Sequence, residues 1–169
     1  MTLLVGQNGG SFGTPIGANP WGTGGNAIYY KNGYTAVAGA MTNLHFTVQA
    51  TASATLATGY VYSGTGPGAS FVAMSAEVSV TTTGDKAPAI SGSLVVGPYI
   101  LIVQTSAGSF QVTVNSGSNS FQDNQNVVAN FPYRGPPSTL PALDNNSGQE
   151  FVIWIDGMLA GGVPLAWTI

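Results

Sequence analysis

Charged residues are scarce in this chain of 169 residues. Asp, Glu, Lys and Arg together make up 5% of the sequence, against roughly 25% in an average soluble protein. The only firm cations are Lys31, Lys86 and Arg134, and the formal net charge is -3. Nucleic-acid binding usually draws on several cationic contacts to phosphates, so a nucleic-acid partner is not expected.

Cysteine is absent, which excludes disulfides, thiol catalysis and zinc sites that contain cysteine. No apolar run reaches the roughly 18 residues that a membrane span requires, and no basic cluster offers membrane docking, so a membrane is not expected as a partner. The first apolar run ends at Val5 and has no positively charged start, unlike a secretory signal peptide. We therefore expect a protein made in the cytoplasm.

Glycine is abundant, with 24 residues, and it is most concentrated at the start of the chain. A Gly- and Pro-rich segment has little apolar surface to offset the entropy lost on ordering. We predict an extended arm over residues 1–26 and a sandwich domain over residues 27–169. Either its own domain or a neighbouring subunit could hold this arm, and we favour the neighbour. The predicted anchors are Leu3, Leu4, Phe12, Ile16 and Trp21.

Short strand-type segments recur from Ala27 onward, which favours an all-β sandwich or barrel. The dipeptide Asn32-Gly33 predicts a tight hairpin between strands at residues 27–31 and 34–38. Residues 42–50 alternate, with Leu44, Phe46, Val48 and Ala50 on one face, as in a half-buried antiparallel strand.

Two stretches are expected to form the middle of the sandwich. Residues 56–75 read as strand, Gly-rich loop and strand, and residues 94–115 are their predicted partner. A turn is predicted at residues 83–86, and the four prolines of residues 132–148 predict a long loop over one end of the sandwich. Further strands are predicted at residues 76–82, 87–94, 127–131, 150–156 and 163–169. Helical periodicity is missing throughout, so we predict an all-β, jelly-roll-like antiparallel β-sandwich.

No set of residues in the sequence indicates a catalytic site. His45 is the only histidine, and no Ser/Asp pattern surrounds it. Glu150 and Asp156 share one strand face roughly 20 Å apart at ~3.3 Å per residue, too far to flank one glycosidic bond. Asp123 with Asp144 stays open as the pair of a small glycan hydrolase. We predict a protein that is not an enzyme.

Two Asx-rich segments supply oxygen ligands of the kind calcium prefers, at residues 123–126 and 144–146. Such segments are commonly turns held by side-chain to backbone hydrogen bonds. A structural calcium stays an alternative, and we predict no cofactor and no metal.

Aromatic side chains beside Asn and Gln could form a sugar-stacking platform. Trp21 and Tyr133 lie in Gly/Pro-rich segments outside the predicted strands, which makes them candidates for a ligand or subunit contact. Trp154 is opposite in phase to Ile153 and Ile155, so it is expected on an exposed face or at a second interface. The remaining aromatic candidates are Tyr29, Tyr30, Tyr34, Tyr62 and Trp167, the last expected in the core.

The segment GYVYSGTGPGASFVAMS, followed by SLVVGPYILIVQTS, resembles the jelly-roll domains of phage accessory structural proteins and of extracellular binding modules. The phage group comprises capsid decoration or cement proteins and the fibres of heads and tails. The resemblance covers residues 56–115, and no binding residue is carried over from it. The Gly-rich arm also looks like the arms with which cement proteins tie capsid subunits together.

The resemblance implies a virion structural protein without catalytic activity, located in the particle after synthesis in the host cytoplasm. Its expected partners are the major capsid protein or other virion subunits, and further copies of itself in a homo-oligomer. The alternative is a carbohydrate-binding or adhesin module, extracellular or in a tail fibre, that holds a glycan through Trp21, Tyr133 or Trp154.

Overall fold

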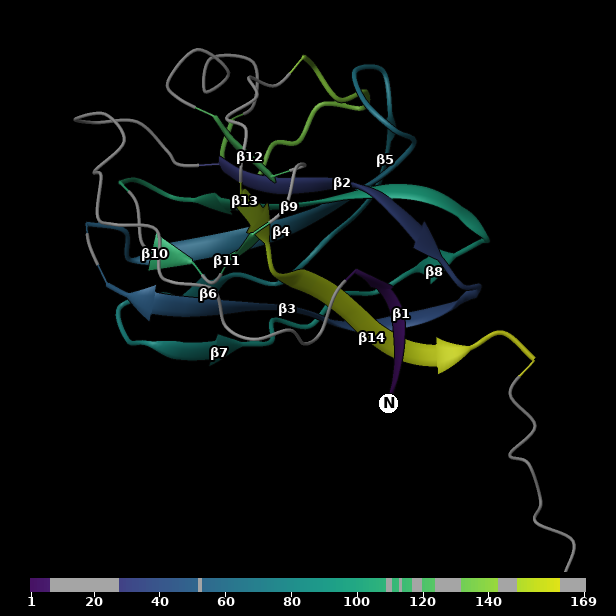
Figure 1. Ribbon diagram of the computed structural model, residues 1–169, viewed down its shortest axis with the longest axis horizontal. Coiled ribbons are helices and arrows are strands. Elements are labelled where there is room, and N and C mark those ends of the chain that lie inside the picture. Colours follow the sequence, from purple (N-terminus) through teal and green to yellow (C-terminus); the bar gives the residue numbers. More distant parts are fainter. Residues whose placement is uncertain are drawn as a thin grey trace, which may run out of the picture.

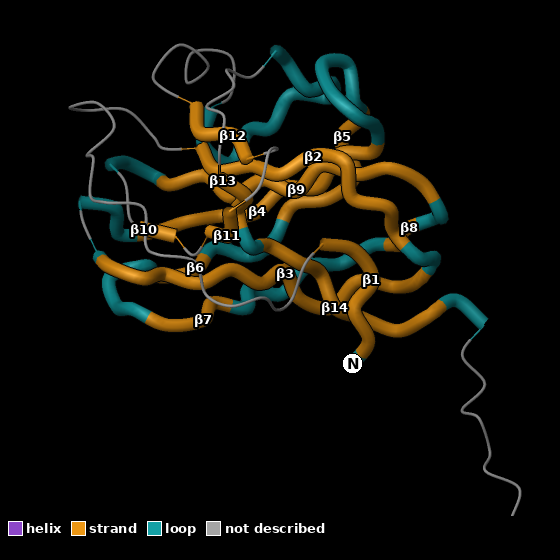
Figure 2. Tube along the Cα trace, in the orientation of Figure 1, coloured by secondary structure: helices purple, strands orange, loops and turns teal. Residues whose placement is uncertain are grey.

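The computed structural model describes residues 1–6, 28–51, 53–108, 111–112, 114–116, 120–123, 132–142 and 149–161. These residues form fourteen strands and contain no helix (Figures 1 and 2). The prediction of an all-β protein is confirmed.

The strands form two larger sheets and one small one, and every pairing between them is antiparallel. The first sheet contains β1 (Thr2–Gly6), β14 (Ile153–Leu159), β3 (Gly39–Ala50), β10 (Gln111–Val112), β7 (Gly84–Lys86) and β8 (Ser93–Leu94). The second contains β12 (Ser120–Asp123), β2 (Ile28–Ala36), β9 (Gly97–Thr105), β4 (Leu56–Ser63), β5 (Ser70–Met74) and β6 (Val78–Ser79). The small sheet pairs β11 (Val114–Ser116) with β13 (Gln149–Phe151).

The main core lies between the two larger sheets, which form the upper and lower layers of Figure 1. From the first sheet, Leu44, Phe46 and Val48 point inward, as the alternation of residues 42–50 predicts. Leu101 and Val103 of β9 face them from the second sheet. The β-sandwich is confirmed, and the jelly-roll order of its strands stays a prediction.

A second apolar cluster lies on the other side of the second sheet. It contains Tyr60 and Tyr62 of β4, Ile100 and Ile102 of β9, and Leu140. The pairing of β4 with β9 confirms the expected partnership between the two central stretches. Because successive side chains of a strand alternate in direction, β4 and β9 bury both of their faces.

Residues 132–142 cover this second cluster. The Leu140 amide donates to the Ala69 carbonyl at 2.8 Å, and the Phe71 amide donates to the Ser138 carbonyl at 2.9 Å. The Tyr62 hydroxyl donates to the Pro137 carbonyl at 2.9 Å. The proline-rich segment therefore lies over a sheet face, which corrects the predicted position at an end of the sandwich.

The hairpin predicted at Asn32-Gly33 is wrong, because β2 runs through both residues as one strand. Lys31 pairs with Leu101 and Tyr34 pairs with Tyr99, so β2 has one more residue between these pairs than β9. Such an insertion is a β-bulge. Continuous pairing with β9 on both sides of the bulge outweighs the local turn preference of the dipeptide.

Other boundaries also differ from the predicted ones. Residues 84–86 form β7 beside β3, where a turn was predicted, and the Thr47 hydroxyl donates to Asp85 at 2.6 Å. The strands predicted at residues 76–82 and 87–94 are reduced to β6 and β8. The strands predicted at residues 127–131 and 163–169 lie outside the described residues.

The first residues of the chain belong to the sandwich. Strand β1 pairs with β14, and Leu4 and Val5 are each 2% exposed in the main core. Residues 2–6 are therefore part of the first sheet and not of an arm. Burial of their apolar side chains in this core is more favourable in free energy than exposure to solvent along an arm. The rest of the predicted arm lies outside the described residues.

We expect Gly157→Ala to destabilise the fold by about 1–3 kcal/mol, the usual cost of overpacking a core. A Cβ at Gly157 would overlap the Ala40 carbonyl oxygen and lie 2.7 Å from Leu4 Cδ1. Urea unfolding measures the loss. The matched control is Gly66→Ala, where nothing lies within 4 Å of the added carbon and the change should stay within about 0.5 kcal/mol. Equal stability of the two variants would contradict this packing.

Candidate functional site

The outer face of the first sheet carries an aromatic pair. Trp154 and His45 are cross-strand partners in β14 and β3, and their rings stack at a centroid distance of 4.8 Å and an interplanar angle of 2°. Trp154 is half-buried between the buried Ile153 and Ile155, so its side chain lies on the outer face, as the alternation of the strand predicts.

Asp156 fixes the position of His45. Its Oδ2 lies 3.0 Å from His45 Nε2, while Oδ1 accepts hydrogen bonds from the Asn43 backbone amide at 3.1 Å and from Asn43 Nδ2 at 3.3 Å. Because the carboxylate only accepts, we assign the ring proton to Nε2, which leaves Nδ1 as an acceptor in the neutral ring. We name Trp154, His45, Asp156 and Asn43 the tryptophan face.

Sequence reasoning missed the carboxylate partner of His45. The two residues are 111 positions apart and meet only because β14 pairs with β3. The signal that was available is the phase of residues 153–159, which puts Trp154 and Asp156 on one face. The local sequence does not show which strand pairs with residues 153–159.

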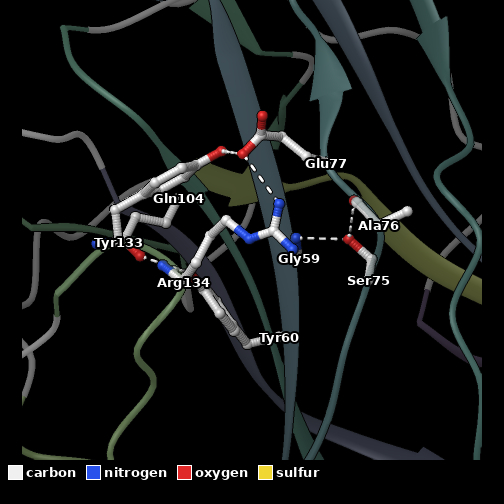
Figure 3. A network of polar contacts seen from close by, with 8 residues as sticks. All are labelled: Gly59, Tyr60, Ser75, Ala76, Glu77, Gln104, Tyr133 and Arg134. Atoms are coloured by element: carbon white, nitrogen blue, oxygen red, sulfur yellow. Dashed lines mark hydrogen bonds and ion pairs between the residues drawn. The ribbon is translucent and has the colours of Figure 1, made fainter.

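A second polar arrangement fastens residues 132–142 to the second sheet (Figure 3). Tyr133 Oη donates to Glu77 Oε2 at 3.0 Å, and Arg134 Nη1 donates to the same oxygen at 3.2 Å. The Arg134 backbone amide donates to Tyr60 Oη at 2.9 Å, and Tyr60 Oη donates to Gln104 Oε1 at 2.8 Å. We name these five residues the tyrosine network.

The tyrosine network holds a strained residue. Arg134 has a φ of 59°, and it is the only residue other than glycine with a positive φ in the described part of the chain. Its ion pair with Glu77 is exposed to solvent and adds little stability. Two hydrogen bonds hold this conformation: its backbone amide donates to the buried Tyr60, and the Gly135 amide donates to the Pro132 carbonyl at 3.0 Å across the turn.

Burial changes the acidity of the tyrosines around this network. It raises the pKa of Tyr60 to about 12, mainly through loss of solvent around the hydroxyl. It also raises the pKa of Tyr62 well above its ordinary value, with a smaller contribution from Tyr60. For Tyr133 burial again comes first, and the neighbouring carboxylate of Glu77 raises the pKa further.

A third feature is apolar and lies at one end of the sandwich, where β8 and the ends of β2 and β14 meet (Figure 1). Ala36 at the end of β2 pairs with Gly97, while Gly39 pairs with Leu94 on one side and Leu159 on the other. The exposed large apolar residues of the described chain are Val37, Val95, Val96, Met158, Leu159 and Met1. We name the first five the apolar end, and Met1 adjoins it through the pairing of Thr2 with Gly157.

The structure separates the residues that were predicted as assembly or ligand contacts. Leu4 is buried in the chain's own core, and Leu3 is half-buried on the outer face opposite Asp156. Tyr133 is half-buried, and its hydroxyl is engaged by Glu77 of the same chain. Trp154 lies on the tryptophan face. Phe12, Ile16 and Trp21 lie outside the described residues.

The described residues contain no group of three or more His, Cys, Asp or Glu side chains that could hold a metal ion. The Asx-rich residues 124–126 and 144–146 lie outside them, so the calcium alternative and the pair of Asp123 with Asp144 stay predictions. Within the same described segments, no helix is long and apolar enough to cross a membrane.

Comparison with known proteins gives no relative: no family, curated protein or solved structure matches the chain. The arrangement of its own residues therefore carries the argument for function.

We expect the stability of the fold to decrease above about pH 10. A tyrosine pKa that is higher in the folded state than its ordinary value of 10.0 stabilises the fold fully below about pH 10. This stabilisation is lost as the pH rises toward the folded value, which is about 12 for Tyr60. Each such tyrosine contributes a slope of up to about 1.4 kcal/mol per pH unit.

Urea unfolding at a series of pH values checks this expectation, with tyrosinate absorbance recorded in parallel. Tyr60→Phe removes one titrating group, so its stability should fall less steeply with pH than that of the wild type. A wild-type stability that stays level between about pH 9 and about pH 11 would contradict the raised pKa values.

Proposed function

We propose that this chain is a structural subunit of a virus particle, a capsid decoration or cement protein, that acts by contact and catalyses no reaction. The apolar end is the observation that carries this proposal. Large apolar side chains on the surface of a monomeric protein are normally scattered, whereas a contiguous patch marks an interaction site. Here the exposed large apolar residues of the described chain gather where three strand ends meet.

Two properties of the apolar end suit a contact surface. Met158 and Leu159 are held by the pairing of β14 with β3. Outside the strands, the Val37 amide donates to the Leu4 carbonyl at 2.9 Å, and the Val95 amide donates to Tyr99 Oη at 3.1 Å. A fixed surface loses little conformational entropy when a partner binds. The chain also has few charges to desolvate, which suits the core of an interface, where charged residues are depleted.

The expected partners are the major capsid protein, other virion subunits and further copies of this chain. A decoration protein stabilises its particle by mass action, because it binds the assembled lattice and not the free capsid subunits. The sequence resemblance to phage accessory structural proteins supports this class. The low charge and the lack of any evident catalytic set in the sequence support a role in assembly.

We expect the double variant Val95→Ser/Val96→Ser to weaken self-association by about tenfold or more. The two side chains are 67% and 73% exposed in the single chain, and burying a valine in an interface contributes about 1.5 kcal/mol or more. Sedimentation velocity over a range of concentrations measures the change. Since both side chains are exposed, the variant should fold as the wild type does.

Ala87→Ser is the matched control, because Ala87 is exposed outside the apolar end, directly after β7. It should associate as the wild type does. A wild type that stays monomeric at every concentration and binds no particle would contradict the proposal. So would a double variant that associates as tightly as the control.

A further inference from the structure

We propose that the tryptophan face binds a neutral saccharide, with the indole of Trp154 as the platform for one pyranose ring. This site lies on the outer face of the first sheet and shares no residue with the apolar end, so it goes beyond the role in assembly. A pyranose presents C–H groups on one face and hydroxyls around its rim. The tryptophan face offers an aromatic ring and polar groups on one sheet surface.

His45 supports one face of the indole, and the β1 residue directly beside Trp154 is a glycine. His45 stacks against it from β3. On the opposite side, the register partner of Trp154 in β1 is Gly6. A Cβ at Gly6 would lie 2.5 Å from Trp154 Cα and 2.9 Å from its Cβ, and Gly6 has a φ of 99°. Since a side chain does not fit there, residue 6 places no side chain against the indole, and the β1 side chain on this face is Leu3, opposite Asp156.

The polar groups of the site are held in place before a ligand arrives. A carboxylate has about four acceptor positions, and Asp156 uses three of them for His45 Nε2, the Asn43 amide and Asn43 Nδ2. Among the residues that the structure describes, the fourth position and Nδ1 of His45 remain as acceptors for sugar hydroxyls. Fixed side chains lower the entropic cost of binding.

The charge of the site selects between saccharide classes. Asp156 is only 16% exposed at its side chain, and its contacts in the site are an imidazole and an amide. An anionic saccharide such as a uronate would bring a second negative charge beside this carboxylate, and like charges repel strongly where solvent is partly excluded. The expected ligand is therefore neutral.

The test uses the full chain and the indole N–H signals of its three tryptophans in a nitrogen–proton correlation spectrum. The probes are cellotriose, maltotriose and chitotriose as neutral trisaccharides, and trigalacturonate as the anionic one. Trp154→Phe assigns the signal of Trp154. We expect at least one neutral probe to shift that signal, with a dissociation constant on the order of 1 mM, and trigalacturonate to leave it unchanged.

Variants locate the site. Trp154→Ala should weaken binding of that probe about tenfold, since aromatic stacking contributes on the order of one tenfold step in affinity. Trp154→Phe should weaken it less, because a ring face remains. The matched aromatic control is Tyr133→Phe, in the segment that covers the other sheet, which should bind as the wild type does.

Three results would overturn the proposal: no neutral probe shifts the Trp154 signal up to about 20 mM, trigalacturonate binds as tightly as the neutral probes, or Trp154→Ala binds as the wild type does. If Trp154→Ala does not fold, two other results decide whether the saccharide binds at Trp154: the affinity of Trp154→Phe and which indole signals of the wild type shift. Because the apolar end takes no part in this test, its failure would leave the role in assembly standing.

Discussion

The described structure depends on one constraint, which is that β9 buries both of its faces. Every residue from Tyr99 to Thr105 is at most 2% exposed. The first sheet covers one face, and residues 132–142 cover the other. The polar side chains in this strand are satisfied, since Gln104 accepts from Tyr60 at 2.8 Å and Thr105 donates to the Gly108 carbonyl at 2.6 Å.

Double burial also explains why tyrosine hydroxyls fasten the outer layer where it is buried, while the ion pair of Arg134 with Glu77 lies at the solvent-exposed rim. A buried charge carries a large desolvation cost, whereas a tyrosine brings a large apolar ring and one hydroxyl that needs only a partner. Tyr60 and Tyr62 bury their rings in the second cluster, and their hydroxyls reach the backbone or side chains around residues 132–142. With 5% charged residues, the chain relies on this chemistry for its structure.

The sequence predicts the parts of this fold that depend on alternation. The inward face of residues 42–50 and the outward position of Trp154 follow from the period of two in a strand. The two central stretches follow from their β-branched and aromatic residues between turn formers. Alternation does not show which other strand a given strand pairs with. Continuous pairing with β9 turned the Asn32-Gly33 dipeptide into a bulge, and pairing with β14 drew residues 2–6 into the first sheet.

The candidate sites also divide into features that the local sequence predicts and features that only the tertiary structure shows. Trp154 could be identified from its phase alone, whereas the contact of His45 with Asp156 needs the register between β3 and β14. Tyr133 lies in a segment without periodicity, and only the tertiary structure shows that Glu77 engages its hydroxyl. The apolar end was not predicted, because its residues come from three separate turns and strand ends whose exposure depends on the whole sandwich.

The sandwich thus presents two surfaces with different chemistry, an apolar end suited to protein contacts and a tryptophan face suited to a neutral sugar. The central claim is that this chain is a subunit of a virus particle. Quantitative mass spectrometry of virus particles purified from cells that produce this chain tests this claim most directly. The account predicts many copies of the chain, in a fixed ratio to the major capsid protein. Particles that are complete and infectious but lack the chain would contradict it.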